Sequence, residues 1–209
     1  GKKTDFVDGM RVTDEETLMV VEEELKKLNL TIVQEIIALG VEAVGLNGKD
    51  KDLIQAEKKK AKVDLGLVGN IVDINPQAIV TELEANKICV VLPMGRGPDK
   101  KTYNVNADEA ASSIASSLKA EKFVLLTNVK GIMRNSEDPH SFISHLTREK
   151  VEGLIDDKVI QTGMIPKVKA CINALDRGVK KTHIVDACIP HALLLEIFTD
   201  KGIGTEIVL

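Results

Sequence analysis

Short apolar runs alternate with amphipathic stretches along most of the chain. The runs have the length and the β-branched content of buried strands, and they lie at 41–46, 87–92, 122–127, 182–186 and 205–209. Between the runs, apolar residues recur at helical spacing, first over 13–28 and 31–39 and later over 163–177. Strands that alternate with helices predict an α/β fold, with a mainly parallel open sheet sandwiched between helices.

Three details of this pattern give sharper expectations. Thr13 and Glu16 have the spacing of a capping box at the start of the first helix. Two β runs, 63–68 and 71–74, flank Gly69-Asn70 and predict a hairpin that stands off the main sheet. Residues 133–146 are polar and contain a proline, which predicts a loop.

The stretch from Tyr103 to Leu118 combines a polar loop with a helix of small residues. Asn106 is a suitable N-cap, and Asp108 and Glu109 fall in the first turn, where the helix dipole favours negative charge. A strand, a polar loop and a helix form ligand sites at the carboxyl edge of open α/β sheets. On position alone, capping explains these side chains more often than ligand binding does.

Composition excludes several classes of function. The net charge is −4 and aromatic residues make up 2% of the chain, which disfavours nucleic-acid binding. The sequence shows neither a membrane-length apolar run nor a signal peptide, so a cytoplasmic protein is expected. The three cysteines lack metal-ligand spacing, and no metal site made of protein ligands is predicted.

Three groups of residues fall at strand ends or helix starts, where backbone N–H groups attract anions: 104–108, 127–131 and 163–167. Lys167 lies in the first turn of a predicted helix, where a cation opposes the dipole, so helix stability would not select it. Arg11 precedes the first helix and is either a surface arginine or a fork for a carboxylate. Residues and spacing alone therefore indicate an α/β protein that binds an anionic, phosphorylated ligand.

Seven motifs, taken together, resemble one family. They are Gly9–Asp14, Val44–Asp50, Asp64–Gly69, Tyr103–Asp108, Leu126–Ile132, Gly163–Lys167 and His191–Thr205. Their order along nearly the whole chain is similar to that of the N-acetyl-L-glutamate kinases in the amino acid kinase family. This resemblance implies ATP-dependent phosphorylation of the side-chain carboxylate of N-acetyl-L-glutamate, in arginine biosynthesis, with Mg²⁺ accompanying the ATP.

The resemblance also implies roles for particular residues. Arg11, Asn104 and Asn106 would bind the acetylglutamate, while Lys167 and Asp108 would be catalytic. The nucleotide would contact Thr127, Asn128, Val129, Gly131, Ile132, Ile160, Gln161, Thr162 and Gly163. Residues 1–103 would form the acetylglutamate-binding lobe and residues 104–209 the nucleotide-binding lobe, both on one shared sheet. His183, Glu196 and Gly204 would line an effector site for arginine, in a homodimer that becomes a homohexamer if an amino-terminal helix exists.

The chain departs from the family pattern at its start. Family members carry a block ahead of the segment at Phe6, with a first strand, a second catalytic lysine and glycine-rich loops. Neither Lys2 nor Lys3 has a context that replaces that lysine, so the 209-residue chain itself is expected to be inactive. Two alternatives stay open: a non-catalytic regulatory subunit that binds nucleotide or arginine, and another kinase of the same fold that acts on aspartate, glutamate, carbamate or a nucleoside monophosphate.

Overall fold

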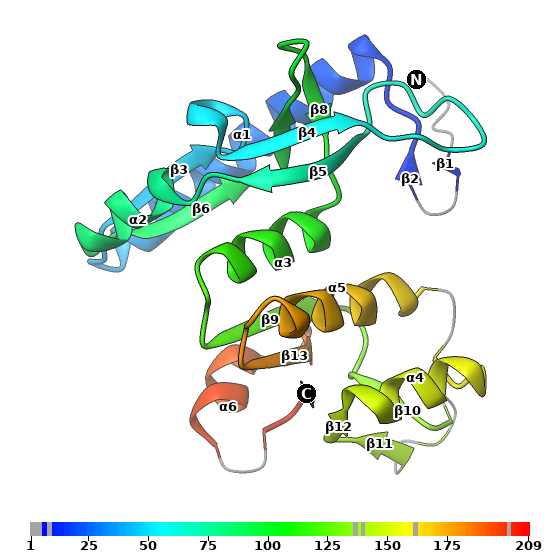
Figure 1. Cartoon of the computed structure of the whole chain (residues 1–209). Coiled ribbons are helices and arrows are strands. Elements are labelled where there is room, and N and C mark those ends of the chain that lie inside the picture. The colour runs from blue at the N-terminus through cyan, green and yellow to red at the C-terminus, as the bar shows by residue number, and fades with distance from the viewer. Residues whose placement is uncertain (1–5, 8–9, 136–137, 139–140, 161–162, 200–201) are drawn as a thin grey trace. The chain divides into compact units, whose positions relative to one another are not determined.

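The structure is a computed structural model, and it describes residues 6–7, 10–135, 138, 141–160, 163–199 and 202–209. Contacts divide the chain into unit 1, Gly1–Ile114, and unit 2, Ala115–Leu209 (Figure 1). The boundary lies inside helix α3 (Ala107–Ser117), after the boundary between 103 and 104 that the sequence suggested. Each unit is described by itself, and a single sheet shared by both stays a prediction.

Unit 1 contains a parallel strand pair, a four-stranded sheet and a short antiparallel pair. Strands β3 (Ala43–Asn47) and β6 (Ile88–Leu92) pair in parallel, and helices α1 (Glu15–Ala38) and α2 (Gln77–Glu84) pack against them. The four-stranded sheet has the order β5-β4-β7-β8, with β5 at Gly69–Ile74, β4 at Ile54–Lys58, β7 at Met94–Arg96 and β8 at Thr102–Asn104. The short pair consists of β1 (Phe6–Val7) and β2 (Met10–Arg11), and a 3₁₀ turn covers Asp50–Asp52.

The two helices predicted at 13–28 and 31–39 are one helix, α1, because nothing between them breaks the backbone pattern. Asn29, in its middle, is buried and donates from Nδ2 to the carbonyl of Val90, 2.8 Å away. Gly45 makes this approach possible, since a Cβ there would lie 2.0 Å from Asn29 Oδ1. The helix ends before Gly40, whose φ of 85° is the left-handed conformation of a helix stop.

The predicted capping box is wrong. Asp14 caps α1, accepting the N–H of Thr17 at 2.9 Å, while the Thr13 hydroxyl donates to the carbonyl of Arg11 instead. The predicted hairpin is wrong. Strand β5 pairs antiparallel with β4 and not with 63–68, and Gly69-Asn70, predicted as the turn, lie within β5. The run 63–68 is diverted because Leu65 and Leu67 exchange backbone hydrogen bonds with Thr13.

Unit 2 is built on a four-stranded sheet of order β12-β14-β13-β9. The strands are β12 (His145–Thr147), β14 (Thr205–Val208), β13 (Lys181–Asp186) and β9 (Lys122–Thr127). Strands β9 and β13 pair in parallel along their whole lengths. Helices α4 (Arg148–Asp156), α5 (Ile165–Asp176) and α6 (Ala192–Phe198) complete the unit, and α5 packs against β13, β14 and β9.

The core of unit 2 lies where α5 meets this sheet and includes Val168, Cys171, Leu175, Ile184 and Ile207. The prediction of a loop at 133–146 is wrong in part. Strand β10 (Ile132–Met133), which begins one residue earlier, pairs antiparallel with β11 (Phe142–Ile143), and Ile132 is buried among the core residues. Parallel strand pairs covered by helices confirm the predicted α/β fold class.

Candidate active site

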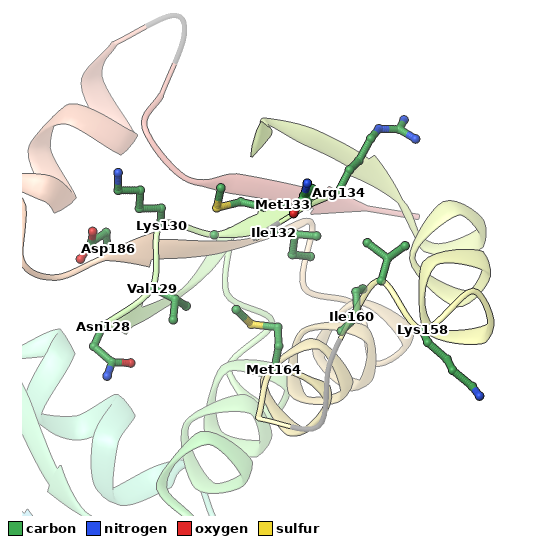
Figure 2. Close-up of a pocket in the computed structure, with 13 residues that line it drawn as sticks. Asn128, Val129, Lys130, Ile132, Met133, Arg134, Lys158, Ile160, Met164 and Asp186 are labelled. Carbon is green, nitrogen blue, oxygen red and sulfur yellow. The ribbon is translucent and has the colours of Figure 1, made fainter. Parts of the chain in front are cut away.

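A pocket of about 660 Å³ lies in unit 2 (Figure 2). It is lined by Asn128, Val129, Lys130, Gly131, Ile132, Met133, Arg134, Asn135, Lys158, Val159, Ile160, Met164 and Asp186. The parallel strands β9 and β13 end in register at Thr127 and Asp186, and the pocket begins where they stop. This is the carboxyl edge at which open α/β sheets bind ligands.

Local hydrogen bonds hold the turn at 127–132 in place. The hydroxyl of Thr127 accepts the N–H of Val129 at 2.9 Å, and its carbonyl accepts the N–H of Ala187 at 2.7 Å. Gly131 has a φ of 107°, and a Cβ on it would lie 2.7 Å from Thr205 Oγ1. The same hydroxyl accepts the N–H of Ile132 at 2.9 Å. The turn therefore presents a fixed shape to the pocket.

The lining combines apolar walls with cations. Figure 2 shows Ile132, Ile160 and Met164 around the pocket, and Lys130 and Asp186 together at one side of it. Lys130, Arg134 and Lys158 carry the positive charges of the lining. Apolar walls suit a flat base, and lysine and arginine suit phosphate oxygens.

Most residues predicted to contact the nucleotide meet here. Asn128, Val129, Gly131, Ile132 and Ile160 line the pocket. Thr127 holds the turn through the hydrogen bond that its hydroxyl accepts from Val129. Gly163 is exposed just before α5. Gln161 and Thr162 lie outside the described residues. The structure brings these positions together, while their contact with a nucleotide stays a prediction.

Asp186 was not predicted from the sequence, and Lys130 and Met164 were covered by the predicted groups 127–131 and 163–167 without being named as site residues. Asp186 is 8% exposed, and one carboxylate oxygen accepts the N–H of Cys188 at 2.9 Å. Its position at the end of a strand was the signal that could have found it, because strand ends are where such sites form. Met164 lies inside the motif Gly163–Lys167, in which the glycine and the lysine were the residues assigned a role.

The predicted acetylglutamate-binding residues lie in unit 1. Arg11 ends β2 and is exposed, while Asn104 ends β8. Asn104 donates its backbone N–H to Leu67 O at 2.9 Å and contacts Thr13 Oγ1 through Nδ2 at 3.4 Å. The hydroxyl of Thr13 donates to Arg11 O at 2.9 Å. The Arg11 main chain and the Asn104 side-chain amide are thus linked through one residue.

Helix α3 begins as the sequence predicts. Asn106 caps it by accepting the N–H of Glu109 at 3.0 Å, and Asp108 lies in the first turn. Lys167 lies in the first turn of α5, in unit 2, and is half-buried. Asp108 and Lys167 belong to different units, so their approach to a common substrate stays a prediction.

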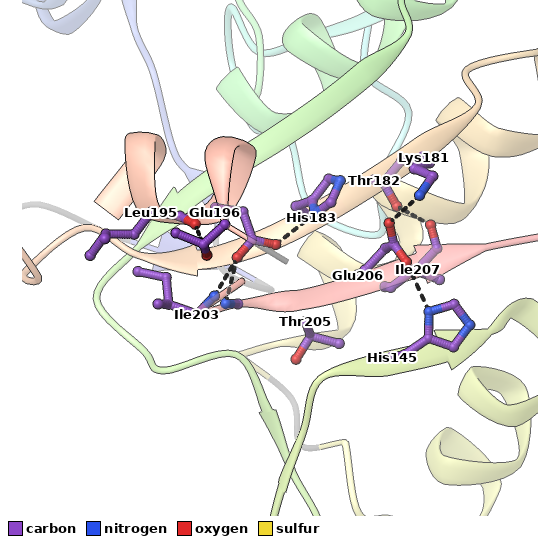
Figure 3. A network of polar contacts seen from close by, with 12 residues as sticks. His145, Lys181, Thr182, His183, Leu195, Glu196, Ile203, Thr205, Glu206 and Ile207 are labelled. Carbon is purple, nitrogen blue, oxygen red and sulfur yellow. Dashed lines mark hydrogen bonds and ion pairs between the residues drawn. The ribbon is translucent and has the colours of Figure 1, made fainter. Parts of the chain in front are cut away.

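The three predicted effector residues form one contact network (Figure 3). His183 Nδ1 and Glu196 Oε1 are 2.6 Å apart, and both side chains are buried. Glu196 Oε2 accepts the N–H groups of Ile203 and Gly204, each at 2.7 Å. A Cβ at Gly204 would lie 2.5 Å from Ile184 O, so glycine is required for this packing.

These contacts set the charge state of Glu196. Burial raises the pKa of its carboxyl, but the N–H groups of Ile203 and Gly204 and the His183 ring outweigh burial. The net effect holds the pKa below the ordinary value of 4.5. Among the described residues, His183 Nε2 is the buried side-chain atom without a hydrogen-bond partner. The network anchors the segment before β14, and an effector role for it stays a prediction.

Within the part of the chain that the structure describes, no three or more His, Cys, Asp or Glu side chains are grouped as metal ligands. None of its helices is both long enough and apolar enough to cross a membrane.

A model of the amino acid kinase family matches residues 1–186. The chain belongs to this family. It is 52% identical over 206 residues to an acetylglutamate kinase of Petrotoga mobilis, covering 98% of this chain and 69% of the relative. It is 50% identical over 208 residues to an acetylglutamate kinase of Caldanaerobacter subterraneus subsp. tengcongensis, covering 99% of this chain and 70% of the relative.

Solved structures agree on the fold. An N-acetylglutamate synthase from Neisseria gonorrhoeae, complexed with coenzyme A and N-acetyl-glutamate, matches with a TM-score of 0.87 and 26% identity. That match covers 100% of this chain but 47% of the synthase chain. A carbamate kinase from Giardia lamblia bound to AMP-PNP matches with a TM-score of 0.61 and 17% identity, over 91% of this chain and 73% of the kinase, which supports the fold alone.

Proposed function

We propose that the protein transfers the γ-phosphoryl group of ATP to the side-chain carboxylate of N-acetyl-L-glutamate. Relatives about half identical over nearly the whole chain carry the name acetylglutamate kinase. The observation that carries the proposal is the unit 2 pocket, which gathers five of the predicted nucleotide-binding residues at the end of a parallel strand pair. Its volume is in the range of about 300–1,000 Å³ that is typical for small-ligand pockets.

In the nucleotide half, the apolar side chains Ile132, Ile160 and Met164 enclose the base, and Lys130, Arg134 and Lys158 are the cations near it. Mg²⁺ binds ATP largely through phosphate oxygens and needs few protein ligands. The Asp186 carboxylate is the pocket group with the right chemistry to hold the hydrated ion. When bound, the ion would supply positive charge that offsets the charge of the phosphates.

In the acceptor half, Arg11 binds the α-carboxylate of N-acetyl-L-glutamate, because a guanidinium donates two parallel hydrogen bonds to a carboxylate. Asn104 adds an amide at the neighbouring strand end. The link from both to Thr13 supports this pairing, since it fixes two segments far apart in the sequence against each other.

The transfer itself needs charge and position but no nucleophilic side chain. The γ-carboxylate oxygen of the substrate forms a bond to the γ-phosphorus while the bond to the β,γ-bridging oxygen breaks, and ADP leaves with that electron pair. Lys167 neutralises charge on the transferred group, and Asp108 orients it. Both residues start helices, where backbone N–H groups add to the binding of an anion.

The test is the trapping of the acyl phosphate by hydroxylamine, with the protein expressed from its complete gene. The proposal predicts a hydroxamate that requires both ATP and N-acetyl-L-glutamate. Glutamate, aspartate, carbamate and a nucleoside monophosphate serve as alternative acceptors, with ADP formation measured as well, because a nucleoside diphosphate product forms no hydroxamate. Product from one of these in place of N-acetyl-L-glutamate, or binding of ATP without any turnover, would refute the proposal.

A further inference from the structure

The hydroxyl of Thr13 lies between two of the residues assigned to the acceptor substrate. Thr13 has no exposed surface, so its polar atoms must find partners inside unit 1. Its hydroxyl donates to the carbonyl of Arg11 at 2.9 Å. Since that bond uses the single hydroxyl hydrogen, the oxygen can act toward Asn104 only as an acceptor.

This restriction determines which way the Asn104 amide faces. The Nδ2 atom of Asn104 lies 3.4 Å from Thr13 Oγ1, long for an N–H···O bond, so the contact orients the amide more than it stabilises it. With Nδ2 toward Thr13, one of its two hydrogens serves this contact. The amide is then held in one of its two flips by a neighbour, and not by the ligand.

The main chain reinforces the same arrangement. Thr13 donates its N–H to Leu65 O at 3.0 Å and accepts the N–H of Leu67 at 2.6 Å. Leu67 in turn accepts the N–H of Asn104 at 2.9 Å. Gly66, between the two leucines, has a φ of 71°, and a Cβ on it would lie 2.2 Å from Thr13 O. The strand ends at Arg11 and Asn104 therefore share one set of hydrogen bonds, centred on Thr13.

We infer that Thr13 is a positioning residue for the acceptor substrate: its hydroxyl holds the Arg11 main chain and the Asn104 amide in the arrangement that binds the substrate's carboxylate. This inference rests on the proposed function. If the buried hydroxyl served stability alone, its removal would change KM for both substrates equally, or for neither. A positioning hydroxyl affects the acceptor selectively, because the nucleotide pocket residues all belong to unit 2.

The test compares Thr13→Val and Thr13→Ser in the protein expressed from its complete gene, with kcat and both KM values measured. Thr13→Val keeps the branched shape and removes the hydroxyl. It is expected to raise KM for N-acetyl-L-glutamate about tenfold, the equivalent of one hydrogen bond, with KM for ATP changed less than about twofold. Thr13→Ser retains the hydroxyl and should restore KM for the acceptor to within about threefold of the unaltered protein.

Thr182→Val is the matched control. Thr182 is also fully buried, and its hydroxyl donates to Ile207 O at 3.3 Å in unit 2. This variant should lower Tm without a selective change in KM for the acceptor. If Thr13→Val does not fold, Gly66→Ala disturbs the same hydrogen bonds from the other side and should produce the same selective rise.

The outcomes separate the two claims. An unaltered protein that forms no product from N-acetyl-L-glutamate overturns the proposed function. An unaltered protein that is active, with Thr13→Val leaving KM for the acceptor unchanged or raising both KM values alike, overturns the positioning role alone. An equally selective rise in KM for the acceptor in Thr182→Val overturns the positioning role as well.

Discussion

Units 1 and 2 assemble their polar sites in different ways. In unit 2, four of the five predicted residues that line the pocket lie within 128–132, on one turn after one strand. In unit 1, Arg11 and Asn104 are linked through Thr13 and the main chain at 65–67, and the contact from Thr13 to Asn104 spans 91 positions. A local site can be seen in a sequence, whereas a site built from distant segments needs the fold.

Each unit also contains a glycine that is required for its site. Gly66 in unit 1 and Gly131 in unit 2 both have positive φ, and a Cβ on either would meet an oxygen atom of a threonine. At Gly66 the oxygen is a main-chain carbonyl, while at Gly131 it is the hydroxyl of Thr205. The backbone, rather than the side chains alone, therefore fixes both sites.

The largest expected effect is kinetic and comes from unit 2. Lys167→Ala should lower kcat by about 10²–10³, because a cation that stabilises the transferring phosphoryl group is lost. Lys169→Ala, an exposed position on the same helix, is the control and should leave kcat unchanged. Hydroxamate formation measures both. Equal losses in the two variants would show that Lys167 has no special role.

The next effect is on stability and also belongs to unit 2. Glu196→Ala should lower the free energy of unfolding by about 3 kcal/mol, because it leaves the buried His183 ring and the N–H groups of Ile203 and Gly204 without their acceptor. Glu121→Ala breaks an exposed ion pair with Lys180 and should cost less than about 0.5 kcal/mol. Urea unfolding compares the two, and similar values would contradict the anchoring role of Glu196.

A pair of glycines tests how far the shape of the pocket depends on its backbone. Gly131→Ala should cost about 1–3 kcal/mol and raise KM for ATP, since its φ of 107° and its close contacts leave no room for a Cβ. Gly153→Ala meets no atom within 4 Å and lies inside α4, so it should stabilise unit 2 by about 0.5–1 kcal/mol. Thermal unfolding measures the stability of both variants, and stability changes of the same sign would contradict this expectation.

The smallest expected effect is a loss of stability at acid pH. The folded-state pKa of Glu196 is lowered, so its contribution to stability is complete above the ordinary value of 4.5 and is lost as the pH falls through the folded-state pKa. Glu206, whose pKa is also lowered by the neighbouring Lys181 and His145 despite its partial burial, acts in the same direction. Glu196→Gln should therefore flatten the decline of stability below that value, measured by urea unfolding at several pH values. If stability declined with falling pH as steeply as in the unaltered protein, other carboxyl groups would be the cause of the decline, and the role given to Glu196 would be wrong.

The sequence predicted the elements whose signals are local. Strand β9, the Asn106 cap and the start of α5 after Gly163 follow from runs of a few residues, and the structure confirms them. Two predictions failed at the same contact. Thr13 has the spacing of a cap, but its hydroxyl donates to Arg11 O and its main chain bonds with Leu65 and Leu67. The run 63–68 contacts Thr13 and does not form the predicted hairpin.

The part of the pocket that was predicted is the part with a local signal in the sequence. Residues 127–132 stood out as a turn at a strand end, and the family resemblance added Ile160. Asp186 was missed because its link to Thr127 is a register between two strands 59 positions apart, which no local pattern reveals. The hydrogen bonds through Thr13 could not be predicted either, since they join segments that only the folded main chain brings together.

The central proposal is that Asp108 and Lys167 both serve the transfer of one phosphoryl group. A double-mutant cycle on kcat, with Asp108→Asn, Lys167→Ala and the combined variant, tests this claim directly. Residues that act as one unit are strongly non-additive, so the combined variant should be within about threefold of the slower single variant. If the two single losses multiply in the combined variant, the residues act independently and the account is wrong.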